Sequence, residues 1–146
     1  ASADMLPRRP TPNDWRIQAT IGHLIVCDKL AFGDRIEAIV SQNRPPIPAV
    51  DVDALASERD DANQPLAALL SQLTELREHY APIVEQLTLD ELYRLGNHEK
   101  YGDFRAGDFA YEWAYHDHSH TMQILALLRQ AAWPNFSETM QTALNS

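Results

Sequence analysis

Two histidines on one predicted helix have a spacing that suits a metal ion. His116 and His120 lie four residues apart in a stretch with helical periodicity, and that spacing places two side chains one turn apart on the same face. Two imidazole nitrogens held in this way can bind one divalent ion at about 2.0–2.1 Å. The intervening His118 points about 200° away from His116 by the helical period. The pair therefore predicts a metal site on this face.

A third histidine occupies an apolar helical segment elsewhere in the chain. His23 is flanked by Ile21 and Leu24. Three histidine ligands leave one coordination position open, which is typical of a reactive metal rather than a structural one. Such an ion can lower the pKa of a bound water, or bind an incoming thiol as its thiolate. On spacing alone, two solvated or hydrogen-bonded helix histidines are the more common explanation of such a pair. The apolar neighbours favour the metal, because buried imidazoles without partners carry a desolvation cost.

Other polar residues near these histidines are candidates for supporting roles. Glu112 lies one turn before His116 on the same face, where it could be a general base or a fourth ligand. Asp117 is a candidate to orient a ligand histidine. Cys27 follows His23 by one turn, although a lone buried cysteine is most often a small core residue.

Composition and charge exclude several classes of partner. The chain has 146 residues with a net charge of −9 and one cysteine. Its length fits one domain over residues 1–146. So acidic a chain is expected to bind neither nucleic acid nor an anionic membrane surface, since Lys and Arg drive that binding. No apolar run reaches the ~18–20 residues that span a bilayer. One cysteine cannot form an internal disulfide, which fits a reducing cytoplasm.

Helical periodicity dominates the chain and predicts an all-α fold. Three long helices are expected near residues 15–41, 63–87 and 106–130, the second with a leucine-rich seam that starts at Leu66 and with Asn63 as its cap. A short helix is expected from a capping box of Thr88 and Glu91 to Gly96, and another from about Ser137. Residues 1–14 contain three prolines and are interpreted as an extended lead-in, with Asn13 or Asp14 capping the first helix. Residues 42–62 form a loop too long for a hairpin, which predicts a crossover along a bundle. Residues 97–104 are expected to form a turn, and no strand-like alternation is visible.

Several short motifs, in this order, resemble the damage-inducible, DinB-like superfamily of metal-binding four-helix bundles. Pro12-Asn13-Asp14-Trp15 followed by Ile21-Gly22-His23-Leu24 is similar to its tryptophan-then-His-Leu signature. The proline-rich stretch with Asp51 and Asp53 resembles its long crossover, and residues 98–102 resemble its His-to-Gly turn. The stretch His116-Asp117-His118-Ser119-His120-Thr121-Met122-Gln123-Ile124 is similar to its His-Asp-x-x-His-x-x-Gln-Ile signature. The resemblance covers roughly residues 7–130.

The resemblance implies a ligand set and a reaction class. His23, His116 and His120 correspond to the metal ligands, with zinc or nickel usual and iron an alternative. Asp117 would be structural or support a ligand, and Gln123 would pack or form a hydrogen bond. His98 falls on a recurrent family position and is interpreted as a turn residue bonding backbone. Well-understood members conjugate a small thiol such as bacillithiol, mycothiol or glutathione to electrophiles. A metal-dependent hydrolase and a non-catalytic metal-binding or assembly bundle in stress response stay open as alternatives.

One departure from the family pattern concerns the N-terminus. Members generally carry a helix of about 25 residues before the position of Trp15, whereas this chain has 14 residues there. Either that helix is short or missing, or the sequence record is truncated, or a partner subunit covers the exposed apolar groove. An uncovered helix-sized apolar face is an association site. The expected assembly is therefore a homodimer.

Overall fold

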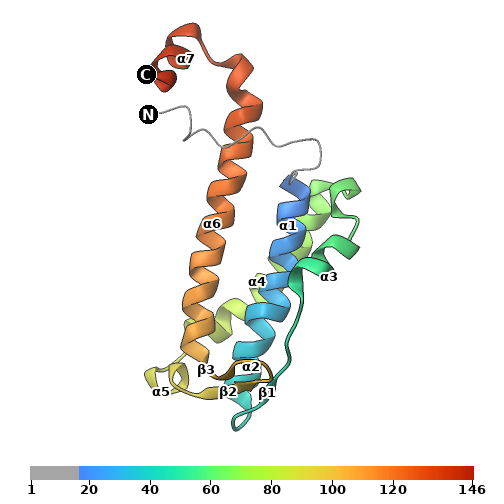
Figure 1. The fold of residues 1–146 in the computed structure, drawn as a ribbon, viewed down its shortest axis with the longest axis vertical. Coiled ribbons are helices and arrows are strands. Elements are labelled where there is room, and N and C mark those ends of the chain that lie inside the picture. The colour runs from blue at the N-terminus through green and yellow to red at the C-terminus, as the bar shows by residue number, and fades with distance from the viewer. Residues whose placement is uncertain (1–16) are drawn as a thin grey trace.

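Three long helical stretches form the body of the molecule (Figure 1). The structure is a computed structural model that describes residues 17–146. The predicted lead-in, its capping residues and Trp15 lie outside the described residues. The first stretch joins α1 (Ile17–Val26), a π-helix (Cys27–Gly33) and α2 (Asp34–Ser41), and the other two are α4 (Leu66–Glu85) and α6 (Ala106–Ala132). The short helices are α3 (Val52–Glu58), α5 (Leu89–Leu92), α7 (Glu138–Asn145) and two 3₁₀ turns, Asp61–Asn63 and Trp133–Asn135. The predicted all-α class is confirmed.

The π-helix makes one wide turn in the middle of the first long stretch. The backbone N–H of Asp34 donates to the carbonyl of Lys29, five residues earlier. A π-turn inserts one extra residue into an α-helix, so everything beyond it is turned back by about 100°. Gly33 closes the turn where α4 packs against it, because a Cβ there would lie 2.6 Å from the ring of Tyr80.

Two apolar clusters hold the helices together. One lies where α2 meets α6 and contains Cys27, Phe32, Ile36, Ile39, Ile47, Ala106 and Phe109. The other lies where α1 meets α4 and contains Ile21, Leu24, Ile25, Leu69 and Leu73. The leucine seam predicted on the second long helix is buried at Leu69 and Leu73, whereas Leu66 at its start is exposed. No helix among the described residues is both long and apolar enough to cross a membrane.

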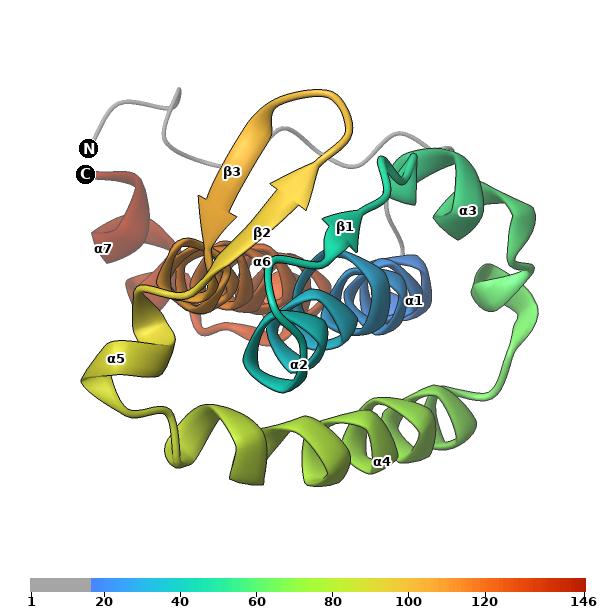
Figure 2. The same ribbon diagram turned by 90° about the horizontal axis from the view of Figure 1, so that it is seen from below.

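A small three-stranded sheet closes the lower end of the bundle (Figures 1 and 2). Its order is β1 (Pro46–Ile47), β2 (Leu95–His98), β3 (Gly102–Arg105), with β1 and β2 parallel and β2 and β3 antiparallel. The predicted turn over 97–104 is therefore part of a hairpin. The predicted crossover loop over 42–62 contains β1 and α3. The two residues of β1 pair with residues about 50 positions away, and β2 and β3 have four residues each. Strands this short show no clear alternation, so the sequence pattern missed them.

The predicted capping signal is confirmed at α5 but wrong at α4, which begins at Leu66 after Pro65 and is not capped by Asn63. Thr88 and Glu91 form the expected capping box, with the Glu91 backbone N–H donating to Thr88 Oγ1 at 3.3 Å. The helix ends at Leu92, earlier than predicted, because Gly96 belongs to β2. Ser137 caps α7 by accepting from the backbone N–H of Met140 at 3.2 Å.

Candidate metal centre

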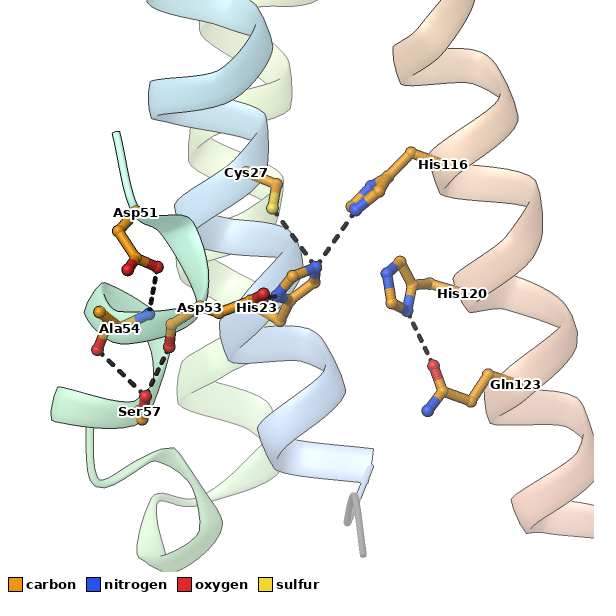
Figure 3. Close-up of polar contacts among 9 residues, drawn as sticks. All are labelled: His23, Cys27, Asp51, Asp53, Ala54, Ser57, His116, His120 and Gln123. Atoms are coloured by element: carbon orange, nitrogen blue, oxygen red, sulfur yellow. Dashed lines mark hydrogen bonds and ion pairs between the residues drawn. The ribbon is translucent and has the colours of Figure 1, made fainter. Parts of the chain in front are cut away.

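Three imidazole rings from two helices converge between α1 and α6 (Figure 3). His23 comes from α1, and His116 and His120 come from successive turns of α6. The Nε2 atoms of His23 and His116 are 3.2 Å apart. One nitrogen from each of the three rings can be chosen so that all lie within 4.8 Å of one another. His23 is 7% exposed, and the other two rings are half-buried.

The geometry and chemistry of these donors fit a divalent ion. Two nitrogens bound at about 2.0–2.1 Å with a tetrahedral angle lie about 3.3 Å apart, close to the 3.2 Å that separates His23 and His116. The Nδ1 atom of His116 is buried, and no described residue forms a hydrogen bond to it. Burial, and then the neighbouring His120, lower the pKa of His23 and lower that of His116 to about 4. Both rings are therefore neutral near pH 7, which is the form that binds metal.

Two residues outside the histidine set lie next to the candidate ligands. The Nδ1–H of His120 donates to Gln123 Oε1 at 2.8 Å, which leaves Nε2 facing the other two rings (Figure 3). Asp53 on α3 brings a carboxylate oxygen to 3.7 Å from His23 Nδ1. Such partners fix the tautomer and orientation of a ligand histidine. Asp53 is joined to His23 through the fold of the crossover, so no local pattern could have paired them.

The family profile of the DinB superfamily matches residues 1–124. The chain belongs to the DinB superfamily. Among solved structures, it is similar to YfiT from Bacillus subtilis, described as a probable metal-dependent hydrolase with an unusual four-helix bundle topology. The TM-score is 0.72 at 19% identity, covering 91% of this chain and 76% of YfiT. None of the curated proteins searched matches the chain. The YfiT likeness shows a shared fold.

The DinB signature on α6 divides its residues between two sides of the helix. Asp117 accepts a hydrogen bond from Arg77 of α4 and therefore supports the packing of α6. This contact agrees with the structural role, one of the two roles that the family resemblance implied for Asp117. Glu112 is exposed and is not among the three gathered donors, so its role as a base stays a prediction.

Two further side chains that the sequence singled out have contacts of their own. Cys27 Sγ lies 3.4 Å from His23 Nε2 but outside the gathered donors. Burial raises the pKa of the Cys27 thiol to about 12, so it is protonated at neutral pH. His98 is buried at the end of β2, and its Nδ1 accepts from the Lys100 backbone N–H at 3.1 Å. That contact agrees with the prediction that this histidine bonds backbone in a turn.

A buried network of charged residues lies beside the three candidate ligand histidines. Asp28 on the π-helix is 0% exposed and accepts from Arg77 Nε and from Trp113 Nε1, each at 2.8 Å. Because Arg77 also bonds Asp117, the network joins the π-helix, α4 and α6 one residue away from His116. Burial raises the pKa of Asp28 even though Arg77 and Trp113 favour its charged form. The network therefore fixes the position of α6 relative to the π-helix. The π-helix begins four residues after His23.

Proposed function

We propose that this DinB protein binds a divalent metal through His23, His116 and His120 and transfers a small thiol to electrophiles. The gathering of three imidazole donors from α1 and α6 within 4.8 Å carries the proposal. Nitrogen donors of this kind suit zinc or nickel, with iron an alternative. Three histidines leave room in the coordination sphere for a substrate.

The surrounding residues support a thiol supplied from outside the chain. A bound divalent ion would supply Lewis acidity, which lowers the pKa of a coordinated thiol or water. The chain's own cysteine is unsuited to be the nucleophile, since the pKa of Cys27 is raised to about 12. Gln123 and Asp53 would keep His120 and His23 oriented while substrate binds. Glu112 is exposed and lies one helical turn before His116, and it is the candidate to accept the thiol proton.

Metal-dependent hydrolysis is the second candidate, and the similarity to YfiT favours it. YfiT is described as a probable metal-dependent hydrolase. The same three histidines would serve, and water would replace the thiol as nucleophile. The two candidates differ in one measurable requirement, because only the first consumes an added thiol.

Metal content tests the shared part of both candidates. Elemental analysis of the untagged protein should find about one divalent ion per chain. His23→Ala should lose most of it. The matched control is His118→Ala, which removes an exposed imidazole between the two α6 candidates. Equal metal in the His23 variant and the wild type would contradict the ligand set.

Turnover then separates the functions. Conjugation of monochlorobimane should be measured with bacillithiol, mycothiol or glutathione, and ester cleavage should be measured without thiol. Thiol transfer above the rate of the His23→Ala protein supports the first candidate, and thiol-independent ester cleavage supports the second. Stoichiometric metal without either activity would contradict both and leave a non-catalytic metal-binding bundle.

A further inference from the structure

Arg35 on α2 is a half-buried cation without an acidic partner among the described residues. Arg44, Arg59 and Arg77 each pair with an aspartate, whereas no ion pair in this part of the chain includes Arg35. Its Nη2 donates to the Pro48 carbonyl at 3.3 Å, and its buried Nε has no hydrogen-bond partner in the same region. Burial lowers the pKa of the guanidinium, and no carboxylate opposes that shift. Arg94, Lys100, Arg105 and Arg129 also lack an ion pair among the described residues, so Arg35 is set apart by its buried Nε without a hydrogen-bond partner.

The π-helix turns Arg35 toward the side of the helix that carries His23. Arg35 follows His23 by 12 residues, which in a regular α-helix would put the two about 120° apart. The extra residue of the π-turn reduces that angle to about 20°. The first long stretch therefore presents a candidate ligand and an unpaired guanidinium along one face.

Contacts with α6 place Arg35 on the same seam as the candidate metal site. The guanidinium carbon lies 5.3 Å from the centre of the Phe109 ring. Phe109 precedes His116 by seven residues on the same face of α6, a separation of about 10 Å along the helix. Phe32 belongs to the same apolar cluster as Phe109, and its ring lies 5.3 Å from that of His116. Pro48, which accepts from Arg35, belongs to the crossover that also brings in Asp53.

We propose that Arg35 binds a carboxylate of the substrate, so that the protein selects an acidic thiol. The inference rests on the proposed function, since it assigns one end of the substrate to the metal and the other to Arg35. A guanidinium presents its N–H groups as a planar fork that matches the two oxygens of a carboxylate. The carboxylate would supply the counter-charge that the described residues do not. The separation of about 10 Å along α6 sets the length of thiol that can reach both points.

Binding of simple mercapto compounds to the cobalt-loaded full-length protein tests the inference without any turnover. The probes are 8-mercaptooctanoate and 8-mercaptooctanol, which differ in the terminal group, and the readout is the thiolate-to-cobalt absorption band. The wild type should bind the acid about tenfold more tightly than the alcohol, the size expected of a charged hydrogen bond. Arg35→Gln should remove that preference and leave the affinity for the alcohol unchanged. Arg35→Lys should keep part of it.

Arg129 provides a matched control, because it is also an arginine stacked over an aromatic ring. Its guanidinium carbon lies 5.8 Å from the centre of the Trp133 ring, nine residues beyond His120. Arg129→Gln should leave the preference for the acid intact. Equal wild-type affinity for acid and alcohol would overturn the inference, as would a preference that survives in Arg35→Gln. Failure to take up cobalt, or to give the thiolate band with either probe, overturns the proposed function itself and the inference with it.

Discussion

Replacing Arg77 with leucine should destabilise the fold by breaking the buried network beside the metal site. Asp28 is fully buried, and without Arg77 its carboxylate would keep one donor among the described residues, Trp113 Nε1. Removing one partner of a buried ion pair costs roughly 3–5 kcal/mol. The Arg77 side chain is 38% exposed, so solvent screens part of the pair and the lower end, about 3 kcal/mol, is expected.

Thermal unfolding measures this cost, and its pH dependence identifies the cause. For a chain of this length, about 3 kcal/mol lowers Tm by about 6–12 °C. Burial raises the pKa of Asp28, so the native state holds the proton of this carboxyl more tightly than the unfolded chain does. Its contribution to stability is therefore largest below the unfolded pKa of about 3.9 and is lost as pH rises through the folded pKa. Removing Arg77 takes away a group that favours the charged carboxylate, so the Tm difference from wild type should grow as pH rises through the folded pKa of Asp28.

Two controls separate the buried pair from general effects of removing an arginine. Arg44→Leu breaks an exposed pair with Asp103 and should leave Tm nearly unchanged. Adding Asp28→Asn to Arg77→Leu removes the unpaired charge and should recover much of the lost stability. A Tm within about 2 °C of wild type, or a difference that does not change with pH, would refute the reasoning.

Three further predictions concern the metal ligands, the cysteine and the assembly. Gln123→Leu removes the acceptor of His120 Nδ1 and should weaken metal binding about 10- to 100-fold in chelator competition; unchanged affinity would mean that packing alone orients the ring. The pKa of Cys27 is raised to about 12, so in the native protein DTNB should react with it slowly up to pH 9 and rapidly only after unfolding; fast native reaction would contradict its burial. Several large side chains are exposed on α6, among them Tyr111, Tyr115 and Met122, and a cavity of about 280 Å³ lies between α4 and α6. Because exposed apolar surface favours association, sedimentation should find a homodimer that Tyr115→Asp weakens. A wild-type monomer would show that this face is exposed to solvent.

Local sequence signals predicted the elements whose causes are themselves local. The leucine seam of α4 and the Thr88 capping box depend on residues three and four apart, which a periodic pattern reveals. The sheet depends instead on pairing between the crossover and the hairpin, such as Ile47 with His98. The π-turn was also invisible, since the residues over 27–33 suit an ordinary α-helix, and the packing of Tyr80 on Gly33 becomes apparent only in the folded chain.

The candidate site likewise contains some contacts that local spacing predicts and others that depend on contacts between elements. The pairing of His116 with His120 follows from helical spacing, and the meeting of both with His23 was expected from their apolar faces and the family signature. Gln123 forms a hydrogen bond to His120, in agreement with the role that the family signature implied, but the partners of Asp117 and His23 could not be named from the sequence. Asp117 turned toward Arg77, and Asp53 reached His23 from the crossover. Supporting contacts of this kind cross between elements, so spacing along one helix cannot identify them.

The π-turn between α1 and α2 makes the seam sensitive to insertions and deletions. Deleting one residue between Cys27 and Gly33 would let the two helices join in regular α geometry, with His23 unmoved and every α2 side chain turned by about 100°. A lineage that lost one codon here would keep its histidines and present a different residue where Arg35 now stands. Diversification of specificity among relatives is therefore expected to track the length of this segment, even where the amino acids around the histidines are the same.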